Sequence, residues 1–305
     1  MKGIAKHMAI VFGGLGLLAL AMGFWSNWNL LGLMNRLDQL VASSESRLAV
    51  RAEPYGSDAR QKLNIWSPKA ASAVPTPRDV IIFFYGGSWN SGERDQYDFV
   101  GRALAEKNYL VVIPDYRLVP QVRFPAFVED GAAAVAWTQA NISRYGGNPD
   151  RIFVSGHSAG AHIAAMVTLD QQWLKKAGAP ANSIKGFAGL AGPYDFYPFT
   201  SDSSRNAFGH LADPKISQPI HFARGDSPPM ILLTGSVDTT VKPRNSNALA
   251  LKIASLGGKA ELRTYPGIDH SEIIMALANP FRTKAPVIGH IDEFVRSVPL
   301  AGSKR

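Results

Sequence analysis

The chain has 305 residues, of which 46% are hydrophobic and 18% are charged, so it can bury a large core in one domain. The formal net charge is +8, but no cluster of five or more Lys or Arg and no base-reading motif accompanies it, which argues against a nucleic-acid partner. The absence of cysteine excludes disulfides, thiolate metal sites and a catalytic Cys.

The first segment of the chain is uncharged and apolar. No charged residue lies between Met8 and Asn35, and the apolar stretch 8–25 is preceded by Lys2 and Lys6. Such a stretch just reaches across a bilayer core as a helix, and the leading lysines favour an N-terminus inside and the rest outside. We therefore expect residues 1–28 to be a hydrophobic helix that is either a membrane anchor or a signal peptide cleaved near residues 19–21. Both alternatives place the remaining chain in the cell envelope or outside the cell.

The next two segments differ in periodicity. Residues 29–47 carry apolar residues at helical spacing, which predicts an amphipathic linker helix that lies on the membrane or on the domain. Residues 48–66 contain two extended runs on either side of Pro54-Tyr55-Gly56-Ser57-Asp58, which predicts an antiparallel β-hairpin.

Beyond residue 77, apolar runs alternate with helical segments. Strands are predicted at 79–85, 109–113, 151–155, 184–190, 229–235 and 260–265, and helices at 95–107, 125–145, 158–169, 243–257 and 286–298. This alternation predicts an α/β domain over residues 48–300, with a mostly parallel sheet of about eight strands and helices on both faces. Residues 191–227 interrupt the alternation with Pro, Ser, Asp and aromatic residues. They form either a small cap over the substrate pocket or a loop whose aromatic side chains pack onto the domain.

One motif in the chain points to a nucleophile. Gly156-His157-Ser158-Ala159-Gly160 lies between the apolar run 151–155 and an alanine-rich helical segment. A strand that turns through one serine into a helix forms a nucleophile elbow, in which small neighbours let the chain bend and expose the hydroxyl. The alternative role is a serine that caps the helix. The position between a buried strand and a helix favours Ser158 as a nucleophile.

A nucleophilic serine needs a base within hydrogen-bond reach and a carboxylate that fixes the tautomer of that base. Asp238 follows the run 229–235, which places it at the same sheet edge as Ser158, although it could also cap a helix. His270 alone among seven histidines follows both the last strand and an acid. The order Ser, Asp, His is that of hydrolases with a nucleophile elbow. His157, beside the nucleophile, is expected to point elsewhere.

A serine nucleophile also requires backbone N–H donors for the oxyanion of the tetrahedral intermediate. Ala159, the residue after the nucleophile, supplies one donor. Gly86 and Gly87, in the loop after the run 79–85, are candidates for the others, because glycine lets the backbone approach a carbonyl oxygen closely. An ordinary glycine turn is the alternative.

Further motifs accompany these residues in a fixed order, namely Asp115-Tyr116-Arg117-Leu118 with Phe124-Pro125, the stretch 146–152, and Asp238-Thr239-Thr240-Val241. With them, the chain resembles the α/β-hydrolase superfamily from about Tyr55 to Val298. The similarity is to the branch of hormone-sensitive-lipase-like carboxylesterases and kynurenine-formamidase-like hydrolases. The resemblance implies an α/β-hydrolase fold that uses no metal or cofactor. It also implies Ser158 as nucleophile, Asp238 as orienting acid, His270 as base and oxyanion donors from Gly86, Gly87 and Ala159.

The chain departs from that family at Tyr85, where the oxyanion loop usually begins with His. Asp115, Arg117 and Asp130 are expected to form a buried ion-pair network that supports the loops. We predict a serine esterase for small acyl or aryl esters. Two alternatives stay open, an arylformamidase-type amide hydrolase and a catalytically impaired, membrane-tethered binding protein on a hydrolase scaffold. The sequence does not fix the oligomeric state.

Overall fold

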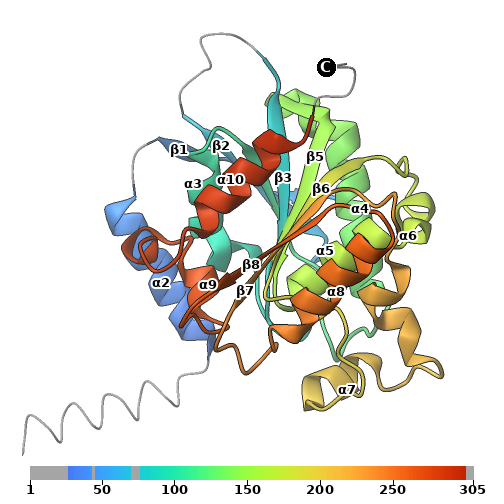
Figure 1. Cartoon of the computed structure of the whole chain (residues 1–305). Coiled ribbons are helices and arrows are strands. Elements are labelled where there is room, and N and C mark those ends of the chain that lie inside the picture. Colours follow the sequence, from blue (N-terminus) through green and yellow to red (C-terminus); the bar gives the residue numbers. More distant parts are fainter. Residues whose placement is uncertain (1–26, 43–44, 70–75, 300–305) are drawn as a thin grey trace, which may run out of the picture.

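The chain folds around one sheet with helices on both faces (Figure 1). A computed structural model describes residues 27–42, 45–69 and 76–299. Among these residues, eight strands form a sheet in the order β1-β2-β4-β3-β5-β6-β7-β8. Strand β2 pairs antiparallel with β1 and β4, and all other neighbours are parallel. The predicted hairpin and the predicted mostly parallel sheet are confirmed.

The strands are β1 (Ser46–Pro54), β2 (Lys62–Pro68), β3 (Arg78–Phe84), β4 (Leu110–Pro114), β5 (Gly147–His157), β6 (Ile184–Leu190), β7 (Met230–Gly235) and β8 (Ala260–Tyr265). The α-helices are α2 (Asn27–Val41), α3 (Asp98–Ala105), α4 (Ala126–Asn141), α5 (Ala159–Leu169), α6 (Gln171–Lys176), α7 (Asp202–Phe208), α8 (Arg244–Ser255), α9 (Glu272–Met275) and α10 (Val287–Ser297). Short 3₁₀ turns are η1 (Arg94–Tyr97), η2 (Ile142–Tyr145), η3 (Pro214–Ser217), η4 (Pro219–Phe222) and η5 (Asn279–Phe281).

Helices α3 and α10 cover one face of the sheet, and α4, α5 and α8 cover the other (Figure 1). Every residue of β4 and β7 is buried, which explains why these strands read as continuous apolar runs rather than as alternating ones. Each fully buried Val, Leu, Ile or Phe contributes about 1.5–3 kcal/mol relative to its exposed state. Because β3, β5, β6, β7 and β8 run parallel, the carboxyl ends of β3, β5, β7 and β8 lie at one edge of this buried sheet.

The junction between β5 and α5 is the sharpest turn of that edge. Ser158 joins the two elements with φ 52° and ψ −122°, a backbone conformation that residues other than glycine rarely adopt. A Cβ on Gly160 would lie 2.1 Å from the Phe84 carbonyl oxygen, and one on Gly156 would lie 2.6 Å from the Gly160 carbonyl carbon. Both positions therefore require glycine, and the elbow predicted from the sequence is present.

Helix α2 ends earlier than the sequence predicts. The expected helix 29–47 stops at Val41, and β1 begins at Ser46, where Ser46, Arg47 and Leu48 pair with the end of β2. Backbone hydrogen bonds join this stretch to β2 instead of to a further helical turn. The helical spacing of apolar residues therefore does not extend the helix beyond Val41. Among other differences, β5 begins at Gly147 because this residue pairs with Arg78, and α6, α7 and α9 were not predicted.

Helix α2 lies on the domain, where it contacts α3, η1 and η5. On this helix, Met34 and Asp38 are buried against the domain, whereas Leu33, Leu37, Leu40 and Val41 are exposed. The predicted anchor or signal peptide 1–28 falls almost entirely outside the described residues. Within the part of the chain that the structure describes, no helix is both long and apolar enough to cross a bilayer.

The requirement for glycine at position 160 of the elbow can be tested against a glycine elsewhere that has free space around it. We expect Gly160→Ala to lower the free energy of unfolding by about 3 kcal/mol, because its Cβ would meet backbone that has no room to move. Gly289, on helix α10, has nothing within 4 Å of an added Cβ, so Gly289→Ala should raise stability by about 0.5–1 kcal/mol through helix propensity. Urea unfolding measures both variants. Equal stability of the two would contradict the close approach at the elbow.

Candidate active site

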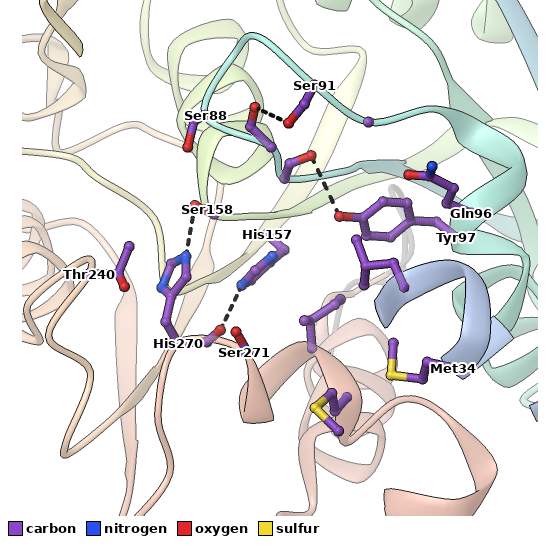
Figure 2. A pocket seen from close by; sticks show the side chains of 16 residues that line it. Met34, Ser88, Ser91, Gln96, Tyr97, His157, Ser158, Thr240, His270 and Ser271 are labelled. Carbon is purple, nitrogen blue, oxygen red and sulfur yellow. Dashed lines mark hydrogen bonds between the residues drawn. The ribbon is translucent and has the colours of Figure 1, made fainter. Parts of the chain in front are cut away.

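Three residues that the sequence singles out meet at the carboxyl edge of the sheet. Ser158 follows β5, Asp238 lies beyond β7 and His270 lies beyond β8. The Nε2 atom of His270 is 2.9 Å from Ser158 Oγ, and its Nδ1 atom is 2.8 Å from Asp238 Oδ2. Figure 2 shows the Ser158–His270 contact among the residues that line a pocket. The fold therefore brings together all three side chains, which are up to 112 residues apart in the sequence.

The surroundings of Asp238 fix the direction of these contacts. The side chain of Asp238 is fully buried, and its Oδ1 atom accepts hydrogen bonds from the backbone N–H of Thr240 (2.9 Å) and Val241 (2.8 Å). These bonds hold the carboxylate so that Oδ2 accepts the proton of His270 Nδ1. The Nε2 atom of His270 then carries a lone pair that faces the Ser158 hydroxyl. This arrangement can remove a proton from Ser158.

The predicted oxyanion loop follows β3, and hydroxyl groups of neighbouring side chains hold it by donating hydrogen bonds to its backbone carbonyls. Tyr116 donates to the Tyr85 carbonyl (2.9 Å), Tyr97 to the Gly86 carbonyl (3.5 Å), and Ser91 to the Gly87 carbonyl (2.8 Å). In a planar trans peptide the N–H points opposite to the carbonyl, so these bonds also orient the N–H groups of residues 86, 87 and 88. Gly86 and Gly87 line the pocket that contains Ser158. Their role as oxyanion donors stays a prediction, as does that of buried Ala159 at the start of α5.

Gly87 is required by this loop. Its φ is 130°, and an added Cβ would lie 2.2 Å from the Ser91 carbonyl oxygen. Ser88 and Trp89 continue the loop at φ 53° and 61°, so three consecutive residues adopt positive φ. Such strain of order 1–3 kcal/mol per non-glycine residue persists only where the surroundings determine the conformation.

Tyr85 does not point toward the pocket. Its buried hydroxyl donates to Asp115 Oδ1 and accepts from Arg60, both at 2.8 Å, and its ring stacks on Tyr97 and Tyr116. Burial, followed by the nearby Asp115 carboxylate, raises the pKa of Tyr85 well above its usual value, so the hydroxyl stays protonated. At the position where the resembled esterases usually have His, this chain therefore has a buried phenol that anchors the start of the loop to Asp115 and Arg60.

The acidic residues near this loop form ion pairs, in agreement with the structural role expected for them. Asp115 pairs with Arg94, and Asp130 pairs with Arg117 at 2.7 Å. Asp115 and Asp130 are buried, so each carboxylate needs its guanidinium partner to offset the cost of leaving water. The Asp115 pair supports the oxyanion loop directly, because Asp115 also accepts the Tyr85 hydroxyl hydrogen.

The insertion 191–227 packs onto the domain through its aromatic residues. Phe196 and Phe208 contact Trp89 at ring-centroid distances of 5.8 and 4.8 Å. His162 joins them by hydrogen bonds with Trp89 Nε1 and with the Ser217 carbonyl, and burial lowers the pKa of His162 to about 4. No residue from 191–227 lines the pocket at Ser158, so these contacts support the alternative of a loop whose aromatic side chains pack onto the domain. Helices α2 and α9 contribute to the wall of that pocket instead.

Comparison with known proteins identifies the family. The chain matches the BD-FAE family over residues 63–253, which is more than half of its length. It belongs to the BD-FAE family. The matched range includes Ser158 and Asp238, whereas His270, α2 and α9 lie outside it.

Relatives of this BD-FAE family member are named as esterases. It is 29% identical over 262 residues to isoprenylcysteine alpha-carbonyl methylesterase ICME of Arabidopsis thaliana, covering 78% of this chain and 59% of the relative. It is 28% identical over 240 residues to esterase LipC of Mycobacterium tuberculosis, covering 71% of this chain and 58% of that protein. The chain thus spans about three fifths of the length of these curated relatives.

A solved structure shows the same fold. Esterase B from Lactobacillus rhamnosis superposes with a TM-score of 0.74 at 19% identity, over 92% of this chain and 96% of that one. The BD-FAE family chain therefore has the α/β-hydrolase fold that its sequence motifs predict.

His157 takes part in the site, contrary to the expectation that it points elsewhere. Its Nε2 atom donates to the carbonyl oxygen of His270 at 3.0 Å, and the two imidazole rings lie 4.8 Å apart (Figure 2). Burial, and then the nearby His270, lowers the pKa of His157 to about 3. A neutral His157 therefore fixes the backbone that carries His270. A histidine at the end of an otherwise apolar strand was the sequence signal for this role.

The lowered pKa of His157 predicts a pH dependence of stability. The unfolded chain binds a proton on this residue below about pH 6.5, whereas the folded chain does so only near pH 3. The stabilisation is complete above pH 6.5 and is lost as the pH falls, by up to about 1.4 kcal/mol per pH unit. We expect His157→Gln, which keeps an N–H donor and does not titrate, to show a shallower loss between pH 6 and 4.

Urea unfolding at several pH values measures this difference. His221→Gln, at an exposed histidine, is the matched control and should follow the wild-type slope. Parallel curves for wild type and His157→Gln would show that His157 is not buried in its neutral form.

Proposed function

We propose that this BD-FAE family member is a serine hydrolase that cleaves carboxylic esters. One observation carries the proposal, the continuous line of contacts from Ser158 through His270 to Asp238 at 2.9 and 2.8 Å. The names of the relatives, a methylesterase and an esterase, support the same activity. Because the chain covers only part of those relatives, the activity is inferred from its own side chains.

In the first half of the reaction, Ser158 Oγ attacks the ester carbonyl carbon while His270 Nε2 takes the hydroxyl proton. The carbonyl π electrons move to oxygen, and the amides of residues 86, 87 and 159 stabilise that oxyanion. When the tetrahedral intermediate collapses, the C–O bond to the alcohol breaks. His270 gives its proton to the departing oxygen, and an acyl-enzyme on Ser158 remains.

Water completes the reaction by the same steps. His270 removes a proton from water as its oxygen attacks the acyl carbon, and the proton then passes to Ser158 Oγ as the acid leaves. The buried Asp238 carboxylate stabilises the imidazolium in both halves. His157 holds the His270 backbone in place while the ring gains and loses its proton.

The alternative of a binding protein on an impaired hydrolase scaffold has weaker support. A site that no longer reacts needs no alignment of the serine, the imidazole and the carboxylate, yet both contacts among these three side chains have hydrogen-bond geometry. Tyr85, which kept this alternative open, has a role in holding the oxyanion loop. An amide hydrolase would use the same residues, so the choice of substrate separates it from an esterase.

Loss of the nucleophile tests the proposed activity. We expect Ser158→Ala to reduce kcat for p-nitrophenyl acetate at least about 1,000-fold, because the acyl-enzyme has no oxygen to form on. Ser57→Ala, at an exposed serine in the β1–β2 loop, is the control and should retain the wild-type rate. Circular dichroism verifies that both variants are folded. Equal rates for wild type and Ser158→Ala would refute the proposal, and assays with N-formylkynurenine distinguish formamide from ester cleavage.

We also propose that the N-terminal segment holds the catalytic domain at a membrane, on its outer side. The apolar stretch 8–25 and the preceding Lys2 and Lys6 support this location. Helix α2 follows directly and exposes Leu33, Leu37, Leu40 and Val41 along one side. Such an apolar stripe suits the interface of a lipid bilayer.

Mass spectrometry of the expressed protein tests this location. We expect the membrane fraction to contain the intact chain of 33.0 kDa, because an uncleaved anchor keeps residues 1–28 attached. A soluble protein that lacks about two dozen N-terminal residues would instead identify the segment as a cleaved signal peptide.

A further inference from the structure

The pocket at Ser158 has two chemically different ends. Ser88, Thr240 and Ser271 lie near the Ser158–His270 pair, whereas Met34 and Tyr97 lie on the opposite side (Figure 2). Gln96 lies beside Tyr97 (Figure 2), and the other side chains at this end are apolar and come from two helices that are distant in sequence, namely Leu31 of α2 and Ile274 and Met275 of α9. The reacting groups therefore stand at the polar end of a pocket whose other end is mostly apolar.

The wall formed by α2 is fixed to the domain. The fully buried Asp38 carboxylate pairs with Arg102 Nε at 2.7 Å and accepts from the Asn279 N–H at 2.6 Å. Asn35 Oδ1 accepts from the same guanidinium at 2.6 Å. These bonds join α2 to α3 and to η5 at the residue after Met34 and one turn beyond it. Met34, only 2% exposed, is therefore held in one place relative to Ser158.

The charges and size of the pocket define the kind of group that fits. Among the residues that the structure describes, neither Lys nor Arg lines the pocket, and His157 stays neutral because burial lowers its pKa to about 3. This part of the chain therefore offers no permanent cation to an anionic substrate. The pocket volume of about 230 Å³ lies below the roughly 300–1,000 Å³ of sites for drug-sized ligands. An uncharged group of few carbon atoms matches both properties.

We infer that the end of the pocket between α2 and α9 binds a short, uncharged hydrocarbon or aryl group of the ester, and that Met34 limits the length of that group. The inference rests on the proposed ester hydrolysis and names the substrate class of the same site. It assigns a specificity-determining residue to a helix that lies outside the range matched by the family. The polar end, with Ser88 and Thr240, receives the carbonyl and the remaining part of the ester.

Substitutions at Met34 test the inference in both directions. The measured quantity is the ratio of kcat/KM for p-nitrophenyl hexanoate to that for p-nitrophenyl acetate, in which a general loss of activity cancels. One methylene group in an apolar pocket changes kcat/KM by about 10- to 200-fold. We therefore expect Met34→Trp, which shortens the pocket, to lower the ratio about tenfold. Met34→Ala, which deepens it, should raise the ratio about tenfold.

The neighbouring residue provides the control. Leu33 lies on the outer side of α2 and is 47% exposed, so Leu33→Ala should keep the wild-type ratio. Thermal unfolding verifies that each variant is folded, and Met34→Ala alone decides the question if the larger Trp prevents folding. A second series, of ethyl, butyl and hexyl acetate, identifies which part of the ester occupies the pocket. A changed ratio in the first series assigns it to the acyl chain, and a change in the second assigns it to the alcohol.

The outcomes separate this inference from the proposed function. If wild-type hydrolysis depends on Ser158 but neither series changes in the Met34 variants by more than about twofold, the pocket assignment is overturned and the esterase remains. If wild type and Ser158→Ala hydrolyse acetate equally, the proposed function itself fails.

Discussion

The chain reverses from β5 into α5 within a single residue, and the positive φ of Ser158 makes that reversal possible. Strain of this kind costs about 1–3 kcal/mol and persists because the surroundings leave no alternative. Gly156 and Gly160 let strand and helix approach to within contact of each other and of β3, and the buried strands on either side keep the turn in place. The turn lifts the Ser158 hydroxyl above the edge where β7 and β8 also end. The distances to His270 and from His270 to Asp238 follow from that common edge.

The loop that faces Ser158 depends on a second, polar layer. Three stacked tyrosines lie behind it, and two of them donate hydrogen bonds to its carbonyl groups. The third, Tyr85, links the loop to Asp115 and its arginine partners. A buried carboxylate is expensive to desolvate, so it contributes a defined position more than net stability. Here the Asp115 carboxylate holds the Tyr85 hydroxyl. Tyr97 and Tyr116 in turn orient the peptide planes that would face an oxyanion.

The pocket combines residues from inside and outside the range matched by the BD-FAE family. Ser158, Asp238 and the oxyanion loop lie within that range, whereas His270, α2 and α9 lie outside it. The base and the wall at the far end of the pocket are thus supplied by segments that the family match does not cover. The buried Asp38–Arg102 pair connects α2 to the matched range, and it fixes the helix that closes the far end of the pocket.

The sequence by itself predicted the hairpin, the parallel strands, the elbow and the three residues that converge on it. Those features depend on local signals, such as apolar runs, glycines that permit a tight turn, and the order of residues at strand ends. It did not predict that α2 stops at Val41, that residues 191–227 avoid the pocket, or that His157 donates to the His270 carbonyl. Periodicity also could not show that Leu31 and Ile274 share a cavity. Each of these depends on residues far apart along the chain, and contact between them arises only once the sheet has placed their elements side by side.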